Sequence, residues 1–143
     1  MSFVNIWVHS VWTTKKRAPL LLQDGRVELF QHIIDNGETK GILVESVNGY
    51  LDHVHCLFRL KNDQTISWCV QQFKGESSHW ANRNNIFPHR LSWQKEYYAV
   101  SVSESIVNTV RTYINNQEEH HRKVSWNQEY RDFIKKYNFR INR

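Results

Sequence analysis

The segment from residue 51 to residue 60 most restricts how this chain can fold. It reads LDHVHCLFRL, which is apolar enough for a buried strand, yet it holds two histidines separated by one residue. Successive side chains of a strand point to opposite faces of the sheet, so His53 and His55 share one face and the apolar residues between and after them share the other. The segment therefore predicts a strand that turns two imidazoles towards one covered face.

Composition favours one globular domain over residues 1–143. Hydrophobic residues make up 40% and charged residues 23%, and six Trp, six Tyr and seven Phe provide bulky core side chains. We find no apolar run long enough to span a membrane and no signal-peptide pattern at the N-terminus, and two cysteines are too few for a disulfide framework, so we expect a cytoplasmic protein. The net charge of +5 suggests a polyanionic partner.

Hydrophobic periodicity predicts the order strand, helix, strand, strand, helix, strand. The expected strands are 3–12, 42–47, the histidine segment and 97–102, and the expected helices run over about 23–40 and from after 63 to about 80. Asn48-Gly49 predicts the turn of a hairpin, and 82–96 reads as a basic loop. This order is that of a ferredoxin-like (RRM-like) α+β fold, with an antiparallel sheet and both helices on one face.

A third helix is expected to open at Ser103-Glu104 and a fourth after Ser125, and both would follow the sheet as appended C-terminal helices. The apolar spacing of the third helix places Gln117 near the middle of its packed face and Tyr113 at the edge. Because the first two helices should cover the opposite face, the third helix is the candidate to cover His53 and His55. It would bring a phenol and an amide oxygen to two imidazoles, a ligand set with open positions for a divalent cation.

Two motifs together resemble a known family. Asp-His-Val-His in the third strand and Tyr-Ile-Asn-Asn-Gln some sixty residues later resemble the single-tyrosine HUH transposases of the IS-two-hundred type, a superfamily that includes the REP-associated tyrosine transposases. The resemblance covers nearly the whole chain. It implies that His53, His55 and Gln117 bind the metal and that Tyr113 is the nucleophile, with Asp52 as a possible partner of one imidazole.

The resemblance also implies the chemistry and the partners. The cofactor would be Mg²⁺ or Mn²⁺, and the donor set is a poor structural zinc site. Tyr113 would form a 5′-phosphotyrosine with single-stranded DNA at hairpin-bearing ends, and a second 3′-hydroxyl would rejoin the strands. A homodimer is implied, commonly with the tyrosine helix of one subunit completing the site of the other.

Basic residues outside the motifs are candidates for phosphate contacts. We expect DNA to be held by Lys15, Lys16, Arg17, Lys74, Arg83, Arg90 and Lys95, with Trp93 available to stack on a base. The run His120-His121-Arg122-Lys123 could be read as a metal-binding tract, but we interpret it as positive charge at a helix C-terminus, which the helix dipole favours.

Two alternatives remain at this stage. A domesticated relative of the same transposases would process repeated palindromes and could act as a monomer. A non-catalytic RNA-binding module on the same sheet would need stacking aromatics on an exposed strand face, where we find His53 and His55 instead. Each histidine or tyrosine taken alone is more often a structural residue, so the interpretation depends on the combination.

Overall fold

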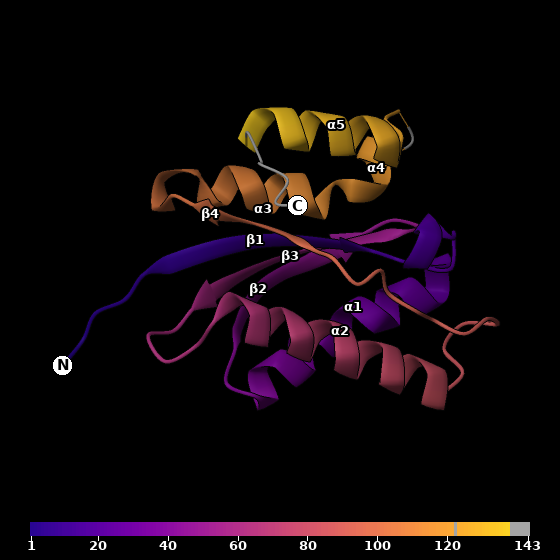
Figure 1. Ribbon diagram of the computed structural model, residues 1–143, viewed down its shortest axis with the longest axis horizontal. Helices are drawn as coiled ribbons and strands as arrows, with labels where there is room; N and C mark the ends of the chain where they lie inside the picture. Colours follow the sequence, from indigo (N-terminus) through magenta and orange to yellow (C-terminus); the bar gives the residue numbers. More distant parts are fainter. Residues whose placement is uncertain (122, 138–143) are drawn as a thin grey trace.

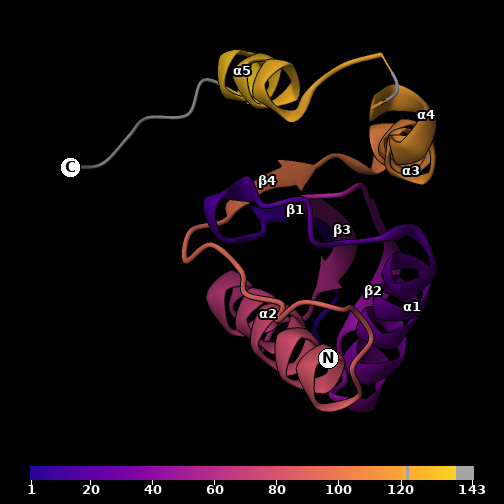
Figure 2. The same cartoon turned by 90° about the vertical axis from the view of Figure 1, so that its right-hand side faces the viewer.

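Four strands form one antiparallel sheet in the order β2-β3-β1-β4, shown in the computed structural model of Figure 1. The structure describes residues 1–121 and 123–137. The strands are β1 (Ile6–Thr13), β2 (Leu43–Gly49), β3 (His53–Leu60) and β4 (Tyr98–Val102). Two long helices, α1 (Gln23–Thr39) and α2 (Ile66–Arg83), lie side by side against one face (Figures 1 and 2). This arrangement confirms the predicted ferredoxin-like fold.

The main hydrophobic core lies between the sheet and these two helices. Val54, Cys56 and Phe58 of β3 are fully buried there, as their alternation with the histidines predicts. The indole ring of Trp12 from β1 stacks on Phe73 of α2, with ring centroids 6.2 Å apart. The apolar side of β3 thus stabilises the fold and leaves its other side for the histidines.

The C-terminal helices cover the histidine face. A single 3₁₀ turn, η2 (Glu104–Ile106), leads into α3 (Val107–Asn115), which is followed by α4 (Gln117–His121) and α5 (Trp126–Tyr137). In Figure 2, all three helices lie on the face of the sheet away from α1 and α2, with α3 and α4 towards the β2 edge and α5 towards the β4 edge. A second, smaller core joins α3 to the sheet through Trp7, Leu57, Val102, Val107, Val110 and Ile114. Within the described ranges, no helix is both long and apolar enough to cross a bilayer.

Polar contacts fix both ends of α3. The indole N–H of Trp7 donates to Glu104 Oε2 at 2.6 Å near the start of the helix. At its end, the side-chain amide of Asn48 donates to the carbonyls of Ile114 and Asn115 at 2.9 and 3.1 Å. The predicted continuous helix through Gln117 is wrong, because Asn48 occupies carbonyls that the next helical turn would use.

The hairpin turn also differs from the prediction. Asn48 and Gly49 belong to β2 and pair with His55 and Val54, so the turn is formed by residues 50–52 instead. An added Cβ at Gly49 would lie only 2.0 Å from the carbonyl oxygen of His53. The glycine is therefore needed for close strand pairing and not for the turn itself.

Replacement of Gly49 by alanine should therefore destabilise the hairpin that carries the histidines. We expect Gly49→Ala to lower the free energy of unfolding by at least about 1–3 kcal/mol, because the obstructing atom is backbone. The matched control is Gly75→Ala in α2, where the added methyl meets nothing within 4 Å and should stabilise the helix by up to about 1 kcal/mol. Urea denaturation measures both, and equal stabilities of the two variants would contradict this account.

Candidate metal and tyrosine site

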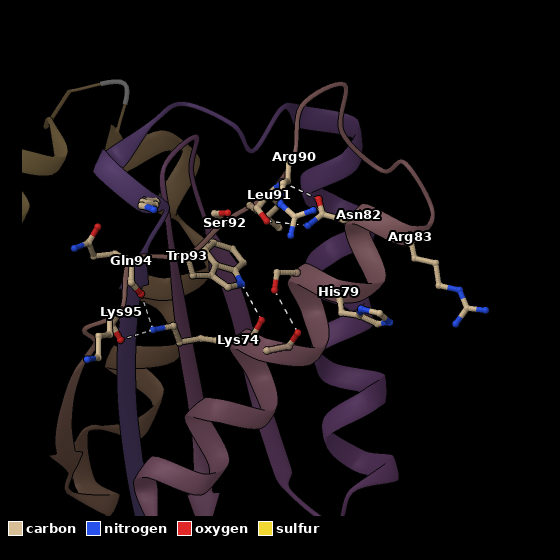
Figure 3. A pocket seen from close by; sticks show the side chains of 13 residues that line it. Lys74, His79, Asn82, Arg83, Arg90, Leu91, Ser92, Trp93, Gln94 and Lys95 are labelled. Carbon is tan, nitrogen blue, oxygen red and sulfur yellow. Dashed lines mark hydrogen bonds between the residues drawn. The ribbon is translucent and has the colours of Figure 1, made fainter.

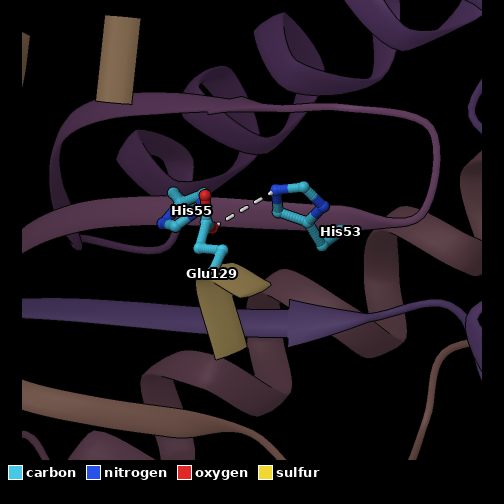
Figure 4. Close-up of side chains that lie close together, drawn as sticks. All are labelled: His53, His55 and Glu129. Atoms are coloured by element: carbon cyan, nitrogen blue, oxygen red, sulfur yellow. Dashed lines mark hydrogen bonds and ion pairs between the residues drawn. The ribbon is translucent and has the colours of Figure 1, made fainter. Parts of the chain in front are cut away.

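Two buried imidazoles of β3 meet a buried carboxylate of α5. His53 and His55 are 0% and 1% exposed, and Glu129 is 4% exposed. Figure 4 shows the Glu129 side chain of α5 directed at His55, with its carboxylate also facing His53. Residues 74 positions apart in the chain are therefore brought together beneath the C-terminal helices.

Four donor atoms converge at this point. His53 Nε2 lies 3.0 Å from Gln117 Oε1 and 3.6 Å from Glu129 Oε1, and His55 Nε2 lies 2.7 Å from that same Glu129 oxygen. Neighbouring donors around a cation with bonds of about 2.0–2.2 Å lie about 2.8–3.6 Å apart. Two nitrogens and two oxygens at this spacing suit a divalent cation with little movement of the side chains.

Each imidazole is held by a partner on its other ring nitrogen. His53 Nδ1 donates to Asp52 Oδ1 at 2.9 Å, which directs Nε2 towards the donor cluster. His55 Nδ1 is hydrogen-bonded to Nε2 of His9 at 2.8 Å, across the β1–β3 pair. Such partners orient metal-binding histidines. His9 is thus for His55 the counterpart of what Asp52 is for His53.

Tyr113 is half-buried at the edge of the cluster. Its ring lies edge-on to His55 and His120, with centroids 5.5 and 5.4 Å apart. It lines a cavity of about 360 Å³ between α3 and α5, together with Asp132 and Lys136. The predicted nucleophile and predicted ligands, Tyr113, His53, His55, Gln117 and Asp52, are thus gathered within one chain.

Burial dominates the protonation of this cluster. Desolvation lowers the pKa of His55 to about 4, although the hydrogen bond to Glu129 acts in the opposite direction. Desolvation also lowers the pKa of His9. Burial alone would raise the pKa of Glu129, but hydrogen bonds from His121 and His55 outweigh it and hold the pKa well below the usual range. At neutral pH the carboxylate is therefore charged and His55 is neutral.

For three residues of the cluster, the prediction from the sequence either missed the residue or gave it another role. Glu129 was not identified, because no spacing relates a residue of α5 to β3. His120 and His121 do end α4, as expected, but their imidazoles turn to Glu129 Oε2 at 2.9 and 2.7 Å. The available signal was a second histidine pair followed by a glutamate on an amphipathic helix.

The predicted DNA-binding residues fall into two neighbouring hollows, both away from the donor cluster. A groove of about 820 Å³ between α2 and the loop 84–97 is lined by five of them, Lys15, Lys74, Arg83, Arg90 and Lys95, and Figure 3 labels the last four. The other two, Lys16 and Arg17, lie in the 3₁₀ turn η1 (Lys15–Arg17) and line a hollow of about 480 Å³ with Tyr98 and Tyr130.

Two groove residues have structural partners. The ammonium of Lys74 donates to the backbone carbonyls of Gln94 and Lys95 at 2.7 and 2.9 Å and thereby holds the loop on α2. Trp93 donates from its indole to the Lys74 carbonyl and packs edge-on against Trp12. The remaining cations of the groove are better placed than Lys74 to meet a ligand.

The chain is similar to known transposases in sequence and in structure. A family model described as "Transposase IS200 like" matches residues 2–117. A candidate transposase from Deinococcus radiodurans R1 is similar in structure, with a TM-score of 0.63, 25% identity, and 81% of this chain and 93% of that chain covered. A REP-associated tyrosine transposase bound to a REP hairpin has the same fold, with a TM-score of 0.56, 16% identity, and 88% and 73% covered. No curated protein matches significantly.

The burial of His55 predicts how stability depends on pH in the metal-free protein. In the unfolded chain His55 takes up a proton near pH 6.5, whereas in the folded chain it does so only near pH 4. The free energy of unfolding should therefore fall as the pH is lowered from 6.5 to 4. The loss is on the order of 3 kcal/mol. Urea unfolding in the presence of chelator, repeated over this pH range, measures the loss. His55→Gln should flatten the decline of stability with falling pH, and the control His89→Gln, at an exposed position, should not. An equally steep decline in His55→Gln would contradict the assignment.

Proposed function

Because this chain belongs to the family of IS200-like transposases, we propose that it cleaves and rejoins single-stranded DNA through a covalent bond between Tyr113 and a 5′-phosphate. One observation carries the proposal: a half-buried phenol lies beside a converging set of imidazole, amide and carboxylate donors. A nucleophile next to a cation site is an arrangement that supports phosphodiester transesterification.

The proposed reaction begins at the phenol oxygen of Tyr113. This oxygen attacks the scissile phosphorus, the new O–P bond forms, and the bond from phosphorus to the 3′ oxygen breaks. The phenol loses a proton and the departing 3′ oxygen gains one. The phosphotyrosine keeps the energy of the phosphodiester, so a second 3′-hydroxyl can attack it and rejoin the strands without ATP.

His53, His55 and Gln117 are the proposed ligands of a divalent cation, and Glu129 Oε1 adds a fourth donor. When bound, the ion polarises the scissile phosphate and offsets the charge that develops there. Mixed nitrogen and oxygen donors suit Mn²⁺ and also accept Mg²⁺. Asp52 and His9 orient the two rings, and Lys136 provides positive charge in the cavity that the phenol lines.

The groove beside α2 is the proposed surface for the DNA backbone. Figure 3 shows Lys74 directed at the loop, whereas Arg83 extends away from α2. Lys15, Arg90 and Lys95 add positive charge along the same groove. A transposase of the same fold is bound to a REP hairpin, and we extend that class of DNA to this chain as part of the proposal.

A homodimer belongs to the proposal, because exchange of two DNA ends with one tyrosine per chain needs two subunits. In the structure, Tyr113 lies beside His55 of its own chain. Completion of the site in trans would require α3 and α4 to change partners. The cytoplasm is part of the proposal as the location of this activity.

An RNA-binding module is not favoured as a second function. Bases would stack on the face of the sheet opposite α1 and α2, and α3 and α4 cover that face at the histidines.

Loss of the phenol oxygen should abolish covalent chemistry. We expect Tyr113→Phe to reduce formation of the protein–DNA adduct at least about a thousandfold while DNA binding persists, because only the attacking atom is removed. Tyr97→Phe, which alters a phenol packed against the main core, is the matched control and should retain the adduct. Denaturing gels with labelled single-stranded DNA and Mn²⁺ detect it, and an adduct with Tyr113→Phe would disprove the assignment.

Tyr113→Phe also tests whether each site is built from one chain or from two. Mixed with His53→Ala subunits, Tyr113→Phe subunits should regain part of the adduct if the tyrosine of one subunit completes the site of the other. No recovery would assign the site to one chain. A second comparison uses two DNA substrates, one from the sequences that flank the gene and one from dispersed palindromes. Adducts with the gene-flanking ends indicate a mobile element, and adducts with the palindromes alone indicate a domesticated relative.

Neutralisation of the groove should weaken DNA binding without loss of the reactive phenol. We expect the combined change Arg83→Gln, Arg90→Gln and Lys95→Gln to reduce the slope of log K against log salt by about 2, because each phosphate contact releases counterions. Lys61→Gln, an exposed cation outside the groove, should leave the slope unchanged. Fluorescence anisotropy with hairpin DNA over a salt series measures both slopes, and equal slopes would exclude the groove.

A further inference from the structure

The carboxylate of Glu129 has two oxygens, and each faces a different pair of imidazoles. Oε1 meets His53 and His55, and Oε2 meets His120 and His121. We propose that His120, His121 and Glu129 Oε2 form a second divalent-cation site, so that the Glu129 carboxylate bridges two ions. The site would take a borderline transition-metal ion such as Zn²⁺, Co²⁺ or Mn²⁺.

The donor geometry supports a cation at this position. Glu129 Oε2 lies 2.9 Å from His120 Nε2 and 2.7 Å from His121 Nε2, and the three ligand atoms all lie within 4.8 Å of one another. The two imidazole planes are almost perpendicular, at 89°, so their nitrogens approach the carboxylate from different directions. Two imidazoles and a carboxylate are a common ligand set for such ions and leave positions for water.

The site is enclosed on one side and nearer to solvent on the other. The side chain of His121 is 2% exposed, and its ring stacks on Tyr50 with centroids 5.5 Å apart. The side chain of His120 is 31% exposed, but its Nε2 is buried, so the ring edge and not the ligand atom meets solvent. Packing therefore holds one ligand in place while the ring of the other borders solvent.

Charge gives an independent reason for a second ion. A carboxylate removed from water is stabilised by compensating positive charge. Glu129 is 4% exposed and contacts four imidazoles. A cation on each oxygen would compensate the buried anion from both sides.

The second site goes beyond the proposed function. His120, His121 and Glu129 all follow residue 117, where the match to the family ends. The ring of His120 lies edge-on to Tyr113. An ion here would fasten α4 to α5 beside the cavity that Tyr113 lines, so its first effect would be on the placement of α5.

Metal counting tests the proposal without reference to DNA chemistry. The full chain is stripped with chelator and titrated with Co²⁺ or Zn²⁺, and bound ions are counted by equilibrium dialysis with elemental analysis. We expect two ions per chain for the unaltered protein and one for His120→Ala/His121→Ala. His53→Ala/His55→Ala should also retain one ion. The matched control His79→Ala/His89→Ala removes two exposed imidazoles and should retain two ions.

Two further variants keep the test decisive. Glu129→Gln should weaken binding of the second ion at least tenfold. Circular dichroism would reveal whether the double variant fails to fold, and in that case the single change His120→Ala should still weaken binding of the second ion at least tenfold. An unaltered protein that binds one ion, with the same affinity in His120→Ala, would overturn the proposal. Adduct formation by Tyr113 is measured separately, so failure of the second site and failure of the proposed function are distinguishable.

Discussion

Burial of two imidazoles on one face of β3 is the constraint on which the C-terminal half of the structure depends. A buried polar group without a partner costs about 1–3 kcal/mol, so whatever covers His53 and His55 must bring hydrogen-bonding atoms with it. The turn before β3 and strand β1 supply two of these, from Asp52 and His9, and the C-terminal helices supply the others, from Gln117 and Glu129. An apolar helix could not cover this face without loss of stability.

The same strand serves two layers because its alternation separates them. The apolar side of β3 packs in one core with α1 and α2. The side that carries the histidines depends on polar contacts to β3 from α4 and α5. Asn48 of β2 links the layers, since it ends α3 at Asn115 and lets the chain restart at Gln117. The break places Gln117 inward and leaves Tyr113 half-buried on the preceding helix, beside the histidines.

Local pattern predicted the parts of the site that lie on one element or on adjacent residues. The period of two in β3 paired His53 with His55, and the spacing of four related Tyr113 to Gln117, although a helix break lies between them. The four-stranded order followed from hydrophobic periodicity. Glu129 could not be predicted, because its contact with His55 depends on how α5 folds back, and no spacing encodes that path. The hairpin turn was displaced because Gly49 serves close pairing.

Glu129 also couples the position of α5 to the donor cluster. Apart from this carboxylate, α5 is tied to the sheet side by a hydrogen bond from Arg17 to Asn127 and by the contact of Tyr130 with Tyr98. The cavity that Tyr113 lines lies between α3 and α5, so a DNA strand that reaches the phenol must pass α5. An ion bound by Glu129 would stabilise the observed position of α5 by its own binding free energy. Access of the proposed DNA strand to Tyr113 and occupancy of the proposed cation site would therefore be linked through one side chain.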